Sequence, residues 1–262
     1  MRKLKKKLIL LDIDGTIVDN DKKIIHPSTI KALELLKQNN HELVIASGRA
    51  YFMLYSIQEI MHLINHYILI NGQHIISRNS TIYEDTINFF SLEKLIRNLN
   101  EKNITYGFES AYKEAISEIN SRVTQAFTDL NLNLPPVNGE FYKEQKVHQM
   151  WCFCDEKDIE ELKKDNPEFD FVRWTTVGCD IIKKGQSKGK GLKFLIEELG
   201  MDIEDVIAIG DGDNDIEMVK MAGLGIAMGN ATEKLKAVSD YVTDHISNDG
   251  FYKAFKYFGL IE

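Results

Sequence analysis

An apolar run that ends in two carboxylates constrains the fold of this chain more than any other stretch. Residues 8–11 are aliphatic, and Asp12, Asp14, Gly15 and Thr16 follow them closely. A run of this kind predicts a buried strand of a parallel sheet. Ligands of open α/β sheets bind beyond the carboxyl ends of the strands, so Asp12 and Asp14 are candidate site residues. Two carboxylates on one face of an extended chain indicate a cation or a reaction that uses them.

Buried strands alternate with helices on both sides of a more polar middle segment. Further apolar runs predict parallel strands at 43–46, 67–70 and 206–209, and an apolar helix is expected at 51–63. The middle segment has strand candidates that alternate, such as 81–84, which predicts an antiparallel sheet with one covered face. We therefore expect an α/β fold, in which residues 1–80 and 181–262 form a Rossmann-like parallel-sheet core and residues 81–180 form an inserted α+β domain.

Polar clusters follow two more of the predicted strands, at the same edge of the sheet. Ser47 and Gly48 can donate hydrogen bonds to phosphate oxygens, and Lys188, at the start of a predicted helix, supplies a positive charge. Asp12 and Asp211 supply the oxygen ligands that Mg²⁺ prefers. Together these groups predict a site for phosphoryl transfer, in which positioning and charge stabilisation dominate.

These clusters, in this order, resemble the four motifs of the haloacid dehalogenase (HAD) superfamily. The run from Gly210 to Met218, together with Asn71-Gly72, resembles the Cof-type phosphatases, whose type-two (C2B-like) cap occupies the position of the insertion. The resemblance implies that Asp12 becomes phosphorylated, that Asp14 is the general acid and base, and that Lys188 is the catalytic lysine. It also implies that Mg²⁺ is bound by Asp12, by Asp14 through its backbone carbonyl and by Asp211, and that Asp215 supports the metal site indirectly or through a water molecule.

The resemblance further implies a set of phosphate-binding groups: Asp12, Thr16, Ser47, Gly48, Lys188 and Asn214. For Asn214 the contact is with either the phosphate or Lys188. Ser47 is also a candidate helix cap, a role that uses the same backbone N–H groups as phosphate binding. Arg49 is expected to be a structural or domain-interface cation rather than a catalytic group.

The expected function is Mg²⁺-dependent hydrolysis of phosphomonoesters of small metabolites, through an aspartyl-phosphate. Sugar phosphates, pyridoxal phosphate and flavin mononucleotide (FMN) are candidate substrates, and the insertion is expected to select among them. Two alternatives stay open at this stage. One is a phosphomutase similar to phosphomannomutases, although the Ser47-Gly48-Arg49 form of the second motif favours a phosphatase. The other is a non-catalytic phosphate-binding protein.

The net charge of −8 over 262 residues disfavours nucleic acid and anionic membranes as partners. The basic start of the chain precedes only four apolar residues, too few for a secretory or membrane-spanning segment, so a cytoplasmic location is expected. Cys152, Cys154 and Cys179 form no disulfide framework and are expected to be reduced, half-buried thiols. The oligomeric state cannot be inferred from these patterns.

Overall fold

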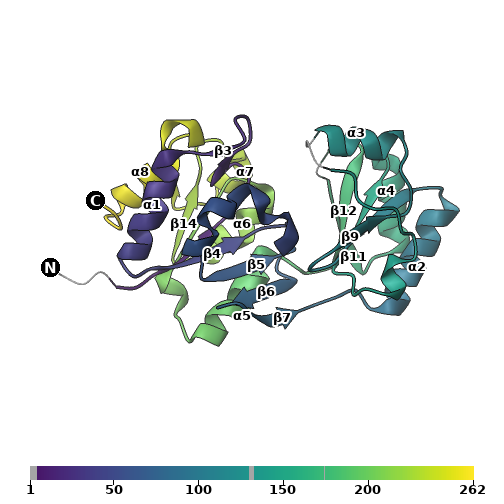
Figure 1. The fold of residues 1–262 in the computed structure, drawn as a ribbon, viewed down its shortest axis with the longest axis horizontal. Coiled ribbons are helices and arrows are strands. Elements are labelled where there is room, and N and C mark those ends of the chain that lie inside the picture. Colours follow the sequence, from purple (N-terminus) through teal and green to yellow (C-terminus); the bar gives the residue numbers. More distant parts are fainter. Residues whose placement is uncertain (1–4, 130–132, 174) are drawn as a thin grey trace. The chain divides into compact units, whose positions relative to one another are not determined.

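The computed structural model describes residues 5–129, 133–173 and 175–262, which belong to two compact units (Figure 1). The first unit contains the chain up to Arg49, then Met53–Glu84 and Ser187–Glu262. The second contains Ala50–Phe52 and Asp85–Gln186. Each unit has its own sheet and is described by itself.

The first unit is built on an eight-stranded sheet with β1 (Leu8–Leu11) near its centre. β1 pairs in parallel with β13 on one side and with β4 on the other, and its four side chains are fully buried. The predicted α/β fold with a parallel-sheet core is confirmed. In sheet order the strands are β15 (Tyr241–Val242), β14 (Leu224–Ala227), β13 (Val206–Gly210), β1, β4 (Glu42–Ala46), β5 (His66–Leu69), β6 (His74–Ser77) and β7 (Ser80–Glu84).

Helices connect the parallel strands of this sheet, whereas β5, β6 and β7 are antiparallel neighbours joined by turns. A two-stranded ribbon of β2 (Val18–Asp19) and β3 (Ile24–Ile25) follows β1. α1 packs against α8, and α5 packs against α6. No helix in the described part of the chain is long and apolar enough to span a membrane. The α-helices of this unit are α1 (Pro27–Gln38), α5 (Lys188–Leu199), α6 (Ile216–Met221), α7 (Glu233–Lys236) and α8 (Gly250–Tyr257).

The expected helix at 51–63 forms as η1 (Tyr51–Leu63), which consists of 3₁₀ turns interrupted by a kink. Its buried side chains recur at every third position, at Leu54, Ile57, Ile60 and Leu63. A 3₁₀ helix has three residues per turn, so this spacing keeps all four on one face, whereas an α-helix would rotate them apart.

The strand candidate at 81–84 belongs to the first unit, which corrects the predicted boundary of the insertion. β7 pairs antiparallel with β6 at the edge of the eight-stranded sheet, through a turn at Arg78 and Asn79. The inserted unit therefore starts at Asp85 rather than at residue 81, and it extends to Gln186 rather than to residue 180. Polar alternation is also typical of an exposed edge strand, so it does not reveal to which sheet a strand belongs.

The second unit contains a five-stranded sheet in which every neighbouring pair is antiparallel, as predicted. In sheet order its strands are β11 (Phe169–Arg173), β12 (Gly178–Lys183), β10 (Gln149–Phe153), β8 (Thr105–Glu109) and β9 (Glu114–Ile116). Its helices are α2 (Phe89–Glu101), α3 (Ser121–Asp129) and α4 (Glu156–Asp165). These observations make the unit an α+β body with its own buried clusters.

The strand β10 is buried on both sides, so the expectation of one covered face was wrong for this strand. Met150 and Cys152 pack into a cluster with side chains from α2 and α4. Trp151 and Phe153 point the other way and pack with Phe127 and its neighbours in α3. All three cysteines are free, as expected, but they are fully rather than half buried because all three lie in the cluster that α2 and α4 cover.

A buried acid, Glu42, lies at the start of β4 in the first unit. Glu42 accepts hydrogen bonds from the His66 ring and from Lys6 Nζ, and the other ring nitrogen of His66 contacts Ser77 Oγ at 2.9 Å. Burial by itself would raise the pKa of Glu42, but the bonds to His66 and Lys6 outweigh it and lower the pKa to about 2. The ionised form of Glu42 is therefore part of the folded state.

We expect Glu42→Gln to lower the free energy of unfolding at pH 7 by about 1–2 kcal/mol, because charged hydrogen bonds are lost. A depressed pKa stabilises the fold above the pKa of the unfolded chain, and this contribution disappears as the pH falls toward 2. The difference between wild type and variant should therefore shrink between pH 5 and pH 2 in urea unfolding. Glu34→Gln, on the exposed side of α1, is the control, and a difference independent of pH would contradict this account.

Candidate active site

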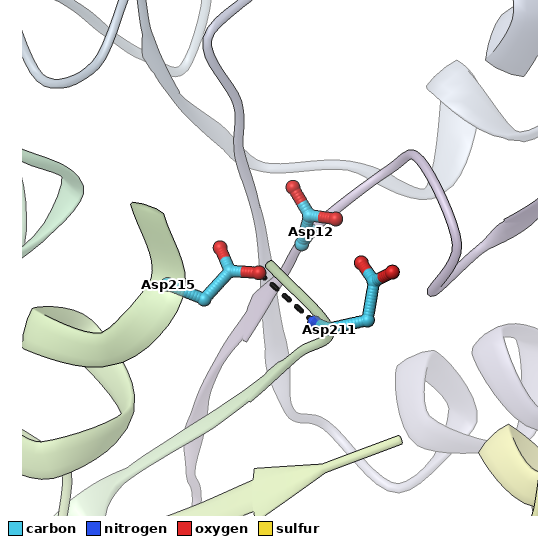
Figure 2. A group of neighbouring side chains, drawn as sticks. All are labelled: Asp12, Asp211 and Asp215. Atoms are coloured by element: carbon cyan, nitrogen blue, oxygen red, sulfur yellow. Dashed lines mark hydrogen bonds between the residues drawn. The ribbon is translucent and has the colours of Figure 1, made fainter. Parts of the chain in front are cut away.

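Three carboxylates meet beyond the carboxyl ends of the central strands (Figure 2). Asp12 follows β1 and Asp211 follows β13, which are neighbours in the sheet. Asp215 comes from η4 (Asp213–Asp215), the short 3₁₀ turn before α6. One oxygen of each carboxylate lies within 4.8 Å of the others. The parallel sheet thus brings together residues from opposite ends of the chain, as the sequence predicted.

Two glycines leave room for this cluster. Gly15 has a φ of +85°, and a Cβ at this position would lie 2.1 Å from Asp211 Oδ2. A Cβ on Gly210 would lie 2.4 Å from Asp215 Oδ2. The same oxygen of Asp215 accepts hydrogen bonds at 2.9 Å from the backbone N–H groups of Asp211 and Gly212. Close backbone approach therefore fixes two of the three carboxylates.

Lys188 provides the positive charge inside the cluster. It is the first residue of α5, which Ser187 caps by accepting a hydrogen bond from Lys190 N–H. The Lys188 side chain has no exposed surface, and Nζ lies 2.6 Å from Asp12 Oδ1 and 2.6 Å from Asp215 Oδ1. One buried ammonium thus joins the ends of β1 and η4.

The balance of charge in the cluster suits a divalent cation. Burial and the charge of Asp215 raise the pKa of Asp12 well above its usual range, although Lys188 opposes this. Burial and Asp215 also raise the pKa of Asp211 to about 6. If ionised, three carboxylates beside one ammonium leave two negative charges. A set of oxygen ligands with this excess of negative charge fits Mg²⁺. The bound cation would lower the raised pKa values of Asp12 and Asp211.

The carboxylate of Asp14 lies outside this cluster and pairs with Arg49. Arg49 Nε donates to Asp14 Oδ2 at 2.8 Å, and Nη2 donates to Oδ1 at 2.7 Å. This two-pronged pair was not foreseen from the sequence, where Arg49 was interpreted as a structural or interface cation. Because its carboxylate is engaged by Arg49, a role for Asp14 toward the cation through its backbone carbonyl stays a prediction from the resemblance.

The predicted phosphate-binding residues lie around the cluster in different settings. Ser47 is buried, and its Oγ accepts a hydrogen bond from Arg49 N–H at 3.1 Å, which leaves the hydroxyl proton to donate. Thr16 Oγ1 donates to Asp211 Oδ1 at 3.3 Å. Asn214 is exposed, and the contacts of Lys188 are with Asp12 and Asp215. A role for Asn214 at the phosphate stays a prediction.

Asn230, which the sequence marked as part of a family-like run without assigning it a role, joins two parts of the site. Its Nδ2 donates to the Gly15 carbonyl at 2.8 Å and lies 3.4 Å from Asp211 Oδ2. Its Oδ1 accepts a hydrogen bond from Ile246 N–H at 3.0 Å. The sequence feature that could have identified Asn230 as a site residue is the one that identified Asp12 and Asp211. Each is a polar residue soon after a buried strand, and for Asn230 this strand is β14.

Comparison with known proteins identifies the class. The family model for haloacid dehalogenase-like hydrolases matches residues 9–255. The chain therefore belongs to this family of hydrolases, and the predicted family is confirmed.

Particular relatives match this chain over more than nine tenths of its length. "Putative phosphatase YkrA" of Bacillus subtilis is 35% identical, over 98% of this chain and 99% of its own length. Pyridoxal phosphate phosphatase YbhA of Escherichia coli is 28% identical, over 92% and 96%. The solved structure of the HAD subclass IIB sugar phosphatase BT4131 has a TM-score of 0.88 and 33% identity, and the match covers 98% of this chain and all of that one.

We expect Lys188→Met to lower the free energy of unfolding by about 3 kcal/mol or more at pH 7, because Asp12 and Asp215 would lose their buried counter-charge. Lys190→Met is the matched control, since Lys190 is exposed two residues further along α5. Urea unfolding of both variants measures the difference. Equal, small losses for the two variants would show that the buried ammonium is not needed for stability.

Proposed function

We propose that this protein is a Mg²⁺-dependent phosphatase that hydrolyses phosphomonoesters of small metabolites through an aspartyl-phosphate on Asp12. The observation that carries the proposal is the contact of Asp12 with Lys188, beside Asp211 and Asp215, at the carboxyl edge of the parallel sheet. A nucleophilic carboxylate, a fixed cation and further acidic ligands are what phosphoryl transfer needs. The relatives named as phosphatases support the same reaction.

The proposed reaction has two steps that use the same residues. First, Asp12 attacks phosphorus, the bond to the ester oxygen breaks, and Asp14 gives its proton to that leaving oxygen. Second, water attacks the aspartyl-phosphate, Asp14 takes the proton from the water, and Asp12 is released with inorganic phosphate. Lys188 and the Ser47 hydroxyl balance negative charge on the phosphoryl oxygens in both steps.

The acidic cluster provides the cation site of this proposal. The ligands would be the carboxylates of Asp12, Asp211 and Asp215 and the backbone carbonyl of Asp14. When bound, Mg²⁺ supplies positive charge that offsets the repulsion between nucleophile and phosphate.

We propose that the substrate is a small phosphorylated metabolite. Pyridoxal phosphate and sugar phosphates are candidate substrates because relatives of this chain are named as phosphatases of these compounds. FMN is a further candidate. We propose that the inserted unit, Asp85–Gln186, selects the substrate. The cytoplasmic location and the absence of nucleic-acid and membrane partners stay predictions from charge and composition.

We expect Asp12→Asn to abolish phosphate release from 4-nitrophenyl phosphate and from a panel of phosphorylated metabolites in Mg²⁺. The amide is isosteric but too weak a nucleophile to attack phosphorus. Asp213→Asn is the control, because Asp213 is an exposed acid that contacts Thr232 and Lys234. Phosphate release that survives Asp12→Asn would contradict the mechanism. A requirement for a bisphosphate activator, without net phosphate release, would instead indicate a phosphomutase.

We expect Mg²⁺ to raise the melting temperature of the chelator-treated wild type, since a ligand of the folded state at a hundredfold excess over Kd stabilises it by about 2.7 kcal/mol. Asp211→Asn should remove most of this shift, and Asp213→Asn should preserve it. Differential scanning fluorimetry across a Mg²⁺ titration measures both. A shift of wild-type size in Asp211→Asn would place the cation elsewhere.

A further inference from the structure

The pairing of Asp14 with Arg49 is more specific than a surface ion pair. Both oxygens of the Asp14 carboxylate accept hydrogen bonds from one guanidinium, at 2.7 and 2.8 Å. Such a two-pronged pair fixes the plane of the carboxylate as well as its distance. Within the described part of the chain, no other side chain is seen to hydrogen bond with this carboxylate, and 41% of the Asp14 side chain is exposed. The orientation of Asp14 therefore depends on Arg49.

Arg49 is itself held from several directions. Its Nη1 donates to the Met53 carbonyl at 3.1 Å, and its backbone N–H donates to Ser47 Oγ. Its guanidinium carbon lies 5.9 Å from the centre of the Tyr55 ring. Only 22% of its side chain is exposed. Arg49 is therefore anchored and mostly buried, and it can fix the orientation of the more exposed Asp14 carboxylate.

We propose that Arg49 is a positioning residue that orients Asp14 for proton transfer to the leaving oxygen. This inference rests on the proposed function, in which Asp14 is the general acid. Arginine keeps its own protons at all relevant pH values, so it can orient the carboxyl group without competing for the transferred proton. When Asp14 carries the proton on one oxygen, the other oxygen can stay hydrogen-bonded to the guanidinium and act as a pivot.

The alternative roles for Arg49 predict different kinetics. A residue that binds the phosphate, or that only supports the loop from Ser47 to Met53, affects every phosphomonoester alike, since all share the phosphate. A residue that positions the general acid affects mainly esters whose leaving oxygen needs a proton. The value of kcat/KM reports steps up to the departure of the leaving group and excludes the later hydrolysis of the aspartyl-phosphate.

The experiment compares kcat/KM for 4-nitrophenyl phosphate, whose leaving group needs little protonation, with that for benzyl phosphate, whose leaving group needs it most. We expect Arg49→Ala to reduce the value for benzyl phosphate by on the order of tenfold more than that for 4-nitrophenyl phosphate, a fraction of what a general acid supplies. Arg49→Lys should recover part of this selectivity, because lysine can make one contact but not two.

A double variant tests whether Arg49 acts through Asp14. Asp14→Asn should show the same preference for 4-nitrophenyl phosphate, and adding Arg49→Ala to it should not increase that preference further. Equal losses on both substrates in Arg49→Ala, or additive selectivity in the double variant, would overturn the proposal.

The matched control is Arg78→Ala, an exposed arginine of the same unit that lies 3.5 Å from Glu42, and it should leave the ratio of the two kcat/KM values unchanged. Melting temperatures identify any variant that fails to fold, in which case Arg49→Lys alone decides by its substrate ratio. If wild type releases phosphate from neither probe nor from the metabolite panel, the proposed function fails. If wild type is active and the Arg49 variants lose activity uniformly, only the role of Arg49 fails.

Discussion

The rest of the site depends on the ion pairs that the buried ammonium of Lys188 forms with Asp12 and Asp215. Removing an ammonium and two carboxylates from water is costly, and the mutual attraction of Lys188 with Asp12 and Asp215 offsets that cost only when the geometry is close. The two short contacts therefore fix the start of α5 against the end of β1 and the turn η4. The same contacts keep Asp12 beside a positive charge, which is where a nucleophile for an anionic phosphate has to be. Fold and proposed chemistry thus share one ion cluster.

The part of the site that the sequence predicted is the part that the backbone determines. Asp12, Asp211 and Lys188 each lie where a regular element begins or ends, and the parallel order of the strands brings those ends to one edge. Apolar runs reveal the strands, so the positions of the residues after them follow directly. Asn230 also lies soon after a buried strand, β14, but its contact with the Gly15 carbonyl depends on the reach of its side chain, so its role did not follow from the sequence.

The features that the sequence did not predict depend on how far a side chain extends or on which sheet a strand joins. The pairing of Arg49 with Asp14 joins a long side chain to a short one across two loops, and no periodic pattern encodes it. The strand β7 alternates in polarity as an inserted strand would, yet it extends the first sheet. The apolar run at 51–63 predicted a helix without its type, and the spacing of its buried residues by three accompanies the 3₁₀ turns of η1.

The central place of β1 also has a consequence for synthesis on the ribosome. Translation delivers β1 and β4 early, whereas β13, the other neighbour of β1, is made only after the whole inserted unit. Domains that are contiguous in sequence fold as soon as they emerge, so the inserted unit can mature while one edge of β1 still lacks its partner. An apolar strand with an open edge is prone to pairing with other chains. Until β13 is made, β1 therefore lacks one of its two neighbours, and the open edge of this apolar strand is available for pairing with other chains.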